Sequence, residues 1–319
     1  MKRMAKEYDV IIIGAGPGGM TAALYASRAN LSVLMLDRGI YGGQMNNTAA
    51  IENYPGFTSI LGPDLGEKMY ASATNSGAEY GYGNVTSVED NGDTKTIHTD
   101  DGDYTAKAVI IATGAEHRHV GVPGEDDYAG KGVSYCAVCD GAFFKDEDVV
   151  VVGGGDSAIE EGIYLTQMAK SVTVIHRRDQ LRAQAILQKR AFANDKMKFV
   201  WNANFEEIKG DGDAITSVRY SDKVTGEDHE LNAKGVFIYV GIKPMTDAFA
   251  GLGVLDDNGW VITDDQMKTS VPGVFAIGDV RAKNLRQIAT AVGEGGLAGQ
   301  GAFTYIQDLA DKDLAATAQ

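Results

Sequence analysis

The only two cysteines of the 319-residue chain, Cys136 and Cys139, are separated by two residues. This spacing lets the two sulfurs close a small ring as a redox-active disulfide, or bind one metal ion together. Asp140 follows directly. A carboxyl group beside the pair can donate a proton to the thiolate that leaves during thiol–disulfide exchange. We therefore expect Cys136, Cys139 and Asp140 to form a catalytic redox centre.

Other interpretations of these residues have less support. A structural zinc site needs about four Cys or His ligands, but the chain has no third cysteine and only five histidines, of which His117 and His119 alone are close together. We therefore predict no metal site. Two inert, buried cysteines are a second alternative. Asp140 precedes a glycine, and because Asp-Gly is a common turn sequence, this residue taken alone is weak evidence for chemistry.

Composition excludes several classes of function. The net charge of −15 disfavours binding to nucleic acid or to an anionic membrane surface. The length and the hydrophobic content of 44% suit two ordinary domains. Two cysteines in so long a chain favour the reducing cytoplasm over a secreted disulfide scaffold. The first apolar run leads straight into a glycine loop, so we expect a strand and no signal peptide, and no segment is long enough to span a membrane.

The N-terminal region carries a dinucleotide-binding pattern. An apolar run on both faces, Tyr8–Ile13, predicts a buried parallel strand. The sequence GAGPGG follows it and opens a helix. Gly14 allows a tight turn, Gly16 lets backbone amides approach a pyrophosphate, and Gly19 lets the helix pack on the strand. A second strand ends at Asp37, about 20 residues on, where a carboxylate can accept hydrogen bonds from ribose hydroxyls.

The middle of the chain repeats this pattern with the opposite ribose chemistry. A buried strand at 148–152 leads into Gly153–Ala158, which opens another helix. After the strand Ser171–Ile175, His176 stands where the first copy has its acid. Two arginines follow it, and arginines at this position bind the additional 2′-phosphate of NADP.

A short helix is expected to extend the arginine site. Asp179 is predicted to cap this helix, which would place Arg182 on the same face as Arg178. A solvated basic helix start is the alternative interpretation. One unit for an unphosphorylated ribose and one for a phosphorylated ribose together predict FAD and NADPH in a flavoprotein oxidoreductase.

Further motifs extend along almost the whole chain. They are GGQ at 42–44, ENYPGF at 52–57, ATG at 112–114, CAVCDGAFF at 136–144, GGGDSA at 153–158, HRRDQLRA at 176–183, GVFAIGDVR at 273–281 and RQIATAVGEG at 286–295. With GAGPGG, this set resembles the low-molecular-weight, bacterial-type thioredoxin reductases. Two positions depart from the family: Asp37, where glutamate is frequent, and Ile288, where alanine is common.

The resemblance implies an α/β fold with two Rossmann-like, three-layer ββα domains, the NADPH domain being inserted into the FAD domain. The expected boundaries are 1–117 for the first part of the FAD domain, 118–245 for the NADPH domain with the cysteines, and 246–319 for the second part of the FAD domain. The resemblance also implies a homodimer.

The resemblance further implies how electrons travel. NADPH reduces FAD, the flavin reduces the Cys136–Cys139 disulfide, and the cysteines reduce the disulfide of thioredoxin. Cys139 is implied to lie nearer the flavin, and Cys136 to be the thiol that attacks the partner. Asp140 is implied to protonate the leaving thiolate, and burial would raise its pKa for this task.

Binding residues follow from these motifs. Those expected at FAD are Gly14, Gly16, Pro17, Gly18, Gly19, Asp37, Gly43, Gln44, Asn53, Ala112, Thr113, Gly114, Gly278, Asp279, Arg286, Gln287 and Ile288. Those expected at NADPH are Gly153, Gly155, Asp156, Ser157, Ala158, His176, Arg177, Arg178 and Arg182.

Four alternative functions remain. The first is an NADPH-dependent reductase of another thioredoxin-like or peroxiredoxin partner. The second is a dithiol oxidase, which would not need an NADPH site. The third is a ferredoxin– or flavodoxin–NADP reductase-like flavoprotein, a class that lacks the cysteine pair. The fourth is a zinc-stabilised nucleotide-binding protein without turnover.

Overall fold

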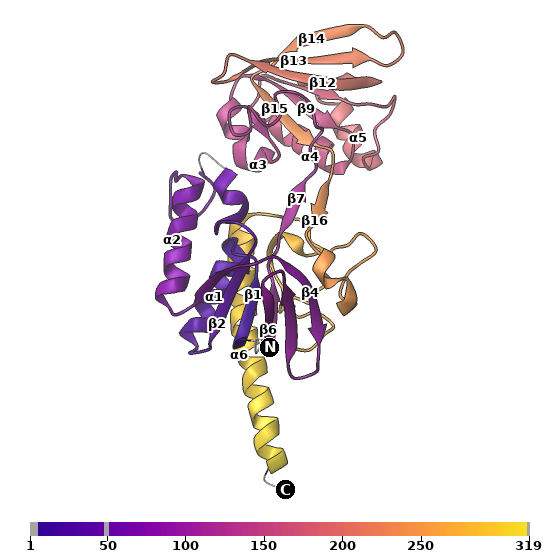
Figure 1. Ribbon diagram of the computed structural model, residues 1–319. Coiled ribbons are helices and arrows are strands. Elements are labelled where there is room, and N and C mark those ends of the chain that lie inside the picture. The colour runs from indigo at the N-terminus through magenta and orange to yellow at the C-terminus, as the bar shows by residue number, and fades with distance from the viewer. Residues whose placement is uncertain (1–5, 48–50, 318–319) are drawn as a thin grey trace. The chain divides into compact units, whose positions relative to one another are not determined.

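The computed structural model describes residues 6–47 and 51–317 and separates into two units (Figure 1). Unit 1 comprises Met1–Glu116 and Lys243–Gln319, and unit 2 comprises His117–Ile242. The chain enters unit 2 through β7 (Ala115–His117) and leaves it through β16 (Ile242–Pro244), and these two short strands pair with each other. The predicted α/β fold with one unit inserted into the other is confirmed.

Unit 1 is built on a mostly parallel sheet of seven strands. Its order is β3 (Glu79–Tyr82), β2 (Val33–Asp37), β1 (Lys6–Ile13), β6 (Gly102–Ile111), β5 (Lys95–Thr99) and β4 (Val85–Asp90), with β17 (Val274–Ala276) also paired to β6. The helical elements are α1 (Pro17–Arg28), α2 (Gly62–Asn75) and α6 (Ile288–Thr317), and the short η1 (Gly43–Asn47), η3 (Asp247–Leu252) and η4 (Gly278–Val280). Strand β5 pairs antiparallel with both β4 and β6, and the other neighbours pair in parallel.

The alternation of side chains along β1 divides the core of unit 1 into two halves. Val10 and Ile12 belong to one buried cluster with residues of α1, α2 and α6. Ile11 and Ile13 belong to a second cluster with residues of the β4–β5 hairpin and η3. Because successive residues of a strand face opposite sides of the sheet, the run of isoleucines is buried on both sides. Unit 1 is therefore a three-layer ββα arrangement.

Unit 2 repeats this plan with shorter elements. Its parallel sheet has the order β11 (Met197–Val200), β10 (Ser171–Ile175), β9 (Asp148–Gly153), β15 (Gly235–Tyr239) and β8 (Val133–Ser134). Its second layer is an antiparallel sheet of β12 (Ala203–Gly210), β13 (Ile215–Asp222) and β14 (Asp228–Asn232). The helical layer has α3 (Ala137–Asp140), α4 (Asp156–Leu165), α5 (Ala185–Phe192) and the short η2 (Gly141–Phe144).

The valines of β9 hold these layers together. Val149 and Val151 pack with residues of α4, whereas Val150 and Val152 pack with residues of the antiparallel sheet. The strand predicted at 148–152 is thus buried on both faces, as its composition indicated. Among the described residues, no helix is both long enough and apolar enough to cross a membrane.

One predicted element is wrong. The helix expected to begin at Asp179 does not form, and α5 begins only at Ala185. The segment between His176 and α5 is irregular because it is tied to the second glycine turn. The Arg182 amide donates to the Gly154 carbonyl at 2.7 Å, and Leu181 is buried. Arg178 and Arg182 are therefore joined by a loop rather than by a helix face.

Glycines allow α1 and α6 to approach each other closely, and Figure 1 shows the two helices running together in unit 1. A Cβ atom on Gly295 would lie 2.4 Å from the Gly18 carbonyl oxygen, and one on Gly299 would lie 2.7 Å from that of Ala22. Both contacts are with backbone, which cannot move aside as a flexible side chain would. The interface therefore requires glycine at both positions.

This packing gives a test of stability. Gly295→Ala should destabilise unit 1 by about 2 kcal/mol, because overpacking a close backbone contact costs about 1–3 kcal/mol. Gly293→Ala is the matched control: its Cβ would meet nothing within 4 Å, so the higher helix propensity of alanine should leave stability equal or slightly higher. Denaturant unfolding of both variants measures the difference. Equal stability of the two would contradict the packing argument.

Candidate active site

The two cysteines lie just after β8, at the carboxyl edge of the parallel sheet of unit 2. Cys136 and Cys139 are joined by a disulfide, with their Cα atoms 5.3 Å apart. Cys136 precedes the single turn of α3, and its sulfur accepts a hydrogen bond from the Cys139 amide at 3.2 Å. The carboxyl edge of a parallel sheet is where α/β proteins bind their ligands. The structure thus holds the pair as a redox disulfide.

Asp140 is held beside this disulfide by a hydrogen bond that the sequence did not predict. The Ser134 hydroxyl donates to Asp140 Oδ2 at 2.6 Å. Burial raises the pKa of the Asp140 carboxyl above its ordinary value of 3.8, and the Ser134 hydrogen bond offsets part of that rise. Asp140 therefore keeps its proton to a higher pH than an exposed aspartate does. Ser134 carries no sequence signal, because serine at a strand end is common.

In unit 1, the first glycine turn is fixed by backbone contacts. Gly14 has φ of +111°, and a Cβ atom there would lie 2.3 Å from the Ala112 carbonyl oxygen. A Cβ on Gly19 would lie 2.0 Å from the Gly14 carbonyl oxygen. A Cβ on Gly16 would meet no atom within 4 Å, and no side chain caps the start of α1. The first amides of α1 are thus open to an anion, as expected for a pyrophosphate.

Asp37 lies beside this turn at the end of β2. Its Oδ2 accepts the Ala15 amide at 2.7 Å and its Oδ1 accepts the Gly39 amide at 2.8 Å. These bonds fix the carboxylate, and each oxygen keeps a lone pair for a further donor. Gly14, Asp37 and Thr113 together line a cavity of about 400 Å³. A fixed carboxylate in a cavity of this size fits the ribose of a dinucleotide.

Asp279 provides a second indication of a bound ligand in unit 1. Its Oδ1 is buried and accepts no hydrogen bond from any described residue. Burial raises the pKa of this carboxyl, while the charges of Lys283 and Arg286 lower it in part. Because buried polar atoms are almost always hydrogen-bonded, this oxygen fits a ligand that carries a hydroxyl donor.

The turn that carries Asp279 is held by hydrogen bonds with Arg286 and with Glu294. The Arg286 guanidinium donates to the carbonyl oxygens of Asp279 and Arg281 at 3.2 and 3.1 Å, and it lies 4.0 Å over the Trp260 ring. Glu294 accepts the Gly278 amide at 2.6 Å and pairs with Arg281 at 2.7 Å. Arg286 was expected at the cofactor, and here it supports the neighbouring backbone. Glu294 was not expected.

Further residues expected at FAD lie in four other segments of unit 1. Asn53 donates to the Gln287 side-chain oxygen at 3.1 Å, so two expected residues far apart in sequence meet. Ile288 is the first residue of α6, and Gly43 and Gln44 begin η1. The Thr113 hydroxyl, which follows β6, donates to the Met245 carbonyl at 2.6 Å.

The second glycine turn is packed like the first. A Cβ atom on Gly153 would lie 2.5 Å from the Tyr239 carbonyl oxygen, whereas one on Gly155 would meet nothing within 4 Å. His176 is 4% exposed, and its ring fills the space beside Gly154. Burial lowers the pKa of His176 below 6.5, so the neutral ring donates from Nε2 to the Gln180 carbonyl at 3.1 Å. The His176 ring thus packs against the backbone of the turn at Gly154.

Three arginines gather beside this turn without acidic partners. Arg177, Arg178 and Arg182 are exposed, and within the described residues their guanidinium groups form no ion pair or hydrogen bond. Asp156, the acid of the glycine turn, accepts the Gln184 amide at 2.7 Å. In a chain with a net charge of −15, three unpaired cations in one loop favour a phosphate ligand.

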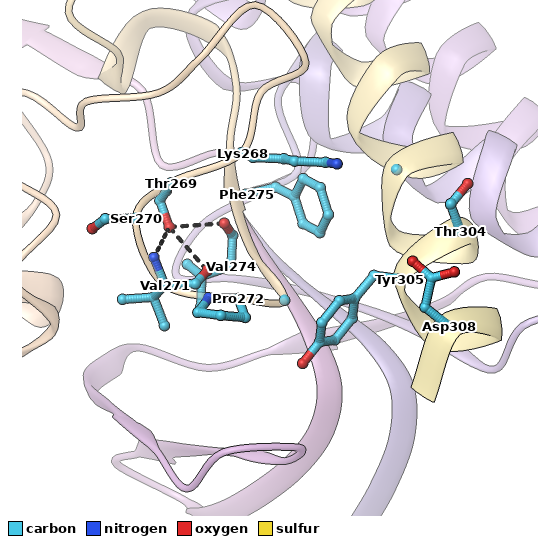
Figure 2. A pocket seen from close by; sticks show the side chains of 12 residues that line it. Lys268, Thr269, Ser270, Val271, Pro272, Val274, Phe275, Thr304, Tyr305 and Asp308 are labelled. Carbon is cyan, nitrogen blue, oxygen red and sulfur yellow. Dashed lines mark hydrogen bonds between the residues drawn. The ribbon is translucent and has the colours of Figure 1, made fainter. Parts of the chain in front are cut away.

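A second cavity in unit 1 is unrelated to the expected sites. It measures about 240 Å³ and is lined by residues of the 268–275 segment and α6 (Figure 2). The Thr269 hydroxyl there is bonded to the Val274 carbonyl at 2.9 Å and to the Val271 amide at 3.1 Å. The cavity includes none of the residues expected at FAD or NADPH, and this hydroxyl is already engaged by the turn.

Comparison with known proteins decides the family. The family model for pyridine nucleotide-disulphide oxidoreductases matches residues 8–295. The chain belongs to this family. The match includes both glycine turns and the disulfide, and the family resemblance expected from the motifs is confirmed.

Individual relatives agree over nearly the full length. The chain is 59% identical over 304 residues to the thioredoxin reductase of Listeria monocytogenes, covering 95% of each chain. It is 56% identical to that of Bacillus subtilis, covering 95% of this chain and 96% of the relative. The solved structure of thioredoxin reductase from Streptococcus pyogenes superposes with a TM-score of 0.93 at 58% identity, covering 95% of this chain and 99% of the other.

The burial of Asp140 leads to a pH-dependent test. Since folding raises its pKa, the native state binds the proton more tightly, and this contribution to stability is lost as pH rises through the native pKa. Asp140→Asn removes the ionisation, so it should be more stable than the wild type at pH 7, with the difference vanishing below about pH 3.8. Thermal unfolding from pH 3 to pH 8 measures this.

Asp195→Asn is the control, because Asp195 is exposed in the same unit. This variant should follow the wild type at every pH. If Asp140→Asn followed it too, the carboxyl would not be destabilised by burial.

Proposed function

We propose that this chain is an NADPH-dependent thioredoxin reductase that contains FAD. The observation that carries the proposal is the Cys136–Cys139 disulfide with a buried carboxyl beside it, in the unit that holds the second dinucleotide turn. The similarity to several bacterial thioredoxin reductases at 56–60% identity supports the same activity.

Each cofactor is assigned to one unit. Unit 1 holds FAD, because it has the open amides of α1, the carboxylate of Asp37 in a cavity and the unsatisfied oxygen of Asp279. Unit 2 holds NADPH, because the loop after β10 offers Arg177, Arg178 and Arg182 to the 2′-phosphate. The bound cofactors supply hydride chemistry that delivers two electrons to the disulfide.

The residues of the chain perform the exchange with thioredoxin. With the pair reduced, the Cys136 thiolate attacks one sulfur of the partner disulfide and forms a mixed disulfide, releasing a thiolate on the partner. Asp140 donates a proton to that leaving thiolate. The Cys139 thiolate then attacks the Cys136 sulfur, which closes the disulfide and releases the partner's second sulfur as a thiolate that takes up a proton from solvent. Burial of Asp140 suits this role, because a raised pKa makes its proton more available near neutral pH than that of an exposed aspartate.

The setting of the enzyme follows from the same evidence. We infer that it acts in the cytoplasm, where thioredoxin is kept reduced, and as a homodimer, as the family resemblance implies. The excess of acidic residues argues against nucleic acid as a partner. Another thioredoxin-like protein or a peroxiredoxin remains the alternative substrate. A ferredoxin–NADP reductase activity has no use for the disulfide.

Turnover with thioredoxin tests the function directly. The purified enzyme should oxidise NADPH in the presence of thioredoxin from a related bacterium, and Cys136→Ser should lower the rate at least 10³-fold, since the serine hydroxyl is a far weaker nucleophile than a thiolate. NADPH consumption and the thiols formed on thioredoxin are both measured. Full activity of the serine variant, or no thiols on thioredoxin with the wild type, would overturn the proposal.

The arginine loop predicts the choice of coenzyme. Arg178→Ala should raise KM for NADPH about tenfold, because one charge-assisted contact with the 2′-phosphate is lost, and should leave KM for NADH unchanged. Arg190→Ala, an exposed arginine on α5, should change neither. Steady-state kinetics with both coenzymes distinguish the variants. A parallel rise for NADH would show that Arg178 does not contact the phosphate.

A further inference from the structure

A half-buried pair of side chains holds the backbone between the two cysteines. The Ala137 amide donates to Glu161 Oε2 at 2.7 Å and lies 2.8 Å from the Tyr239 hydroxyl oxygen. The Tyr239 hydroxyl donates to the same Glu161 oxygen at 2.7 Å. Glu161 comes from α4 and Tyr239 from the end of β15, so two elements of unit 2 meet on one peptide group. Ala137 itself is fully buried.

The environment of this pair keeps both groups engaged. Burial, followed by the Glu161 charge, raises the pKa of Tyr239 well above 10, so the phenol stays protonated and donates. Burial raises the pKa of Glu161 too, while its bonds from Tyr239 and Ala137 lower it in part. The charge of Asp140 also contributes to the raised pKa of Tyr239. Two acids, Glu161 and Asp140, therefore lie close to the disulfide, and the exchange mechanism uses only Asp140.

We propose that Glu161 and Tyr239 are positioning residues for the redox disulfide, and that the Glu161 carboxylate makes the Cys136–Cys139 bond harder to reduce. The inference rests on the proposed function, for which this disulfide is the group that carries electrons. Neither residue is assigned a part in proton transfer or in binding a cofactor.

Two physical effects act in the same direction. Anchoring the Ala137 amide keeps Cys136 and Cys139 within reach of each other after reduction, so reclosure of the ring loses little conformational freedom. A negative charge bonded to the amide that follows Cys136 also disfavours a thiolate on that residue. A less stable reduced form means a lower reduction potential for the pair.

The same helix links this anchor to the coenzyme turn. Helix α4 begins at Asp156, directly after the glycine turn, and Glu161 lies five residues further along it. The backbone that approaches the coenzyme phosphates and the side chain that holds the disulfide thus belong to one short rigid element. Because α4 is one helix, the glycine turn and the Glu161 side chain keep a fixed separation within unit 2.

The equilibrium of the holoenzyme with a small dithiol measures the effect. Dithiothreitol transfers two electrons and two protons to the disulfide, so Cys136 and Cys139 become thiols and dithiothreitol becomes its cyclic disulfide. Acid quenching followed by alkylation counts the protein thiols at each ratio of reduced to oxidised reagent. NADPH and thioredoxin are absent, so a failure of the proposed function would leave this measurement intact.

Glu161→Gln should shift this equilibrium about tenfold toward the dithiol, which corresponds to a potential about 30 mV higher. Tyr239→Phe should shift it about threefold in the same direction, since the amide loses one acceptor. Because both residues hold one amide, the double variant should shift it by less than the product of the two.

Glu160→Gln is the matched control: it removes the same charge from the exposed neighbour of Glu161 on the same helix. Its dithiol–disulfide equilibrium should stay within about twofold of the wild type. The melting temperature of every variant is measured alongside, so that a loss of stability is told apart from a shift in this equilibrium. A shift in Glu161→Gln no larger than that in Glu160→Gln would overturn the proposal, as would a double variant whose shift equals the product.

Discussion

Close contact between backbone groups is the constraint on which both units depend. In each unit, a glycine at the end of the central strand or directly after it lies against a carbonyl oxygen of the neighbouring segment. Gly14, which follows β1, faces Ala112, and Gly153, which ends β9, faces Tyr239. No side chain fits into these contacts. They bring the chain back sharply after the strand, so that the following helix starts with free amides at the carboxyl edge of the sheet. Asp37, at the end of β2, and the two cysteines, just after β8, lie at that edge of their own sheets.

Buried carboxyl groups are the second common feature, and each has a different compensation. Asp140 is held by a serine hydroxyl and Glu161 by a tyrosine and an amide. Asp279 Oδ1 accepts no hydrogen bond from any described residue, and its Lys283 ion pair is long, at 3.8 Å. Burial raises the pKa of all three. A buried carboxyl group is unfavourable for folding unless such contacts compensate its lost hydration.

The arrangement of unit 2 shows how one short helix can serve two purposes. The first turn of α4 directly follows the glycine sequence. Its fifth residue, Glu160, is exposed to solvent, and its sixth, Glu161, accepts the Ala137 amide between the cysteines. The arginine loop is tied to the same turn by the bond from Arg182 to Gly154 and by the bonds from Gln184 to Asp156. The arginine loop is thus hydrogen-bonded to the glycine turn, and helix α4, which starts at that turn, is hydrogen-bonded to the peptide between the cysteines.

Local sequence determined much of this protein. Apolar runs buried on both faces, such as those of β1 and β9, require parallel strands between two layers, and the glycines after them require tight turns. The spacing of the cysteines favoured the disulfide that the structure contains, and the positions of Asp37 and the arginines predict which kind of ribose each unit binds.

Tertiary structure decided what depends on segments far apart in the chain. The loop from His176 to Ala185 is irregular because contacts with Gly154 and Asp156 outweigh the local helix signal at Asp179. The bracing of Asp279 by Glu294 and the anchoring of Ala137 by Glu161 and Tyr239 join residues that no local pattern relates. Burial also raised the pKa of Asp140, Glu161 and Asp279. Periodicity and spacing report how a segment folds, whereas hydrogen bonding and desolvation depend on which segments the fold brings together.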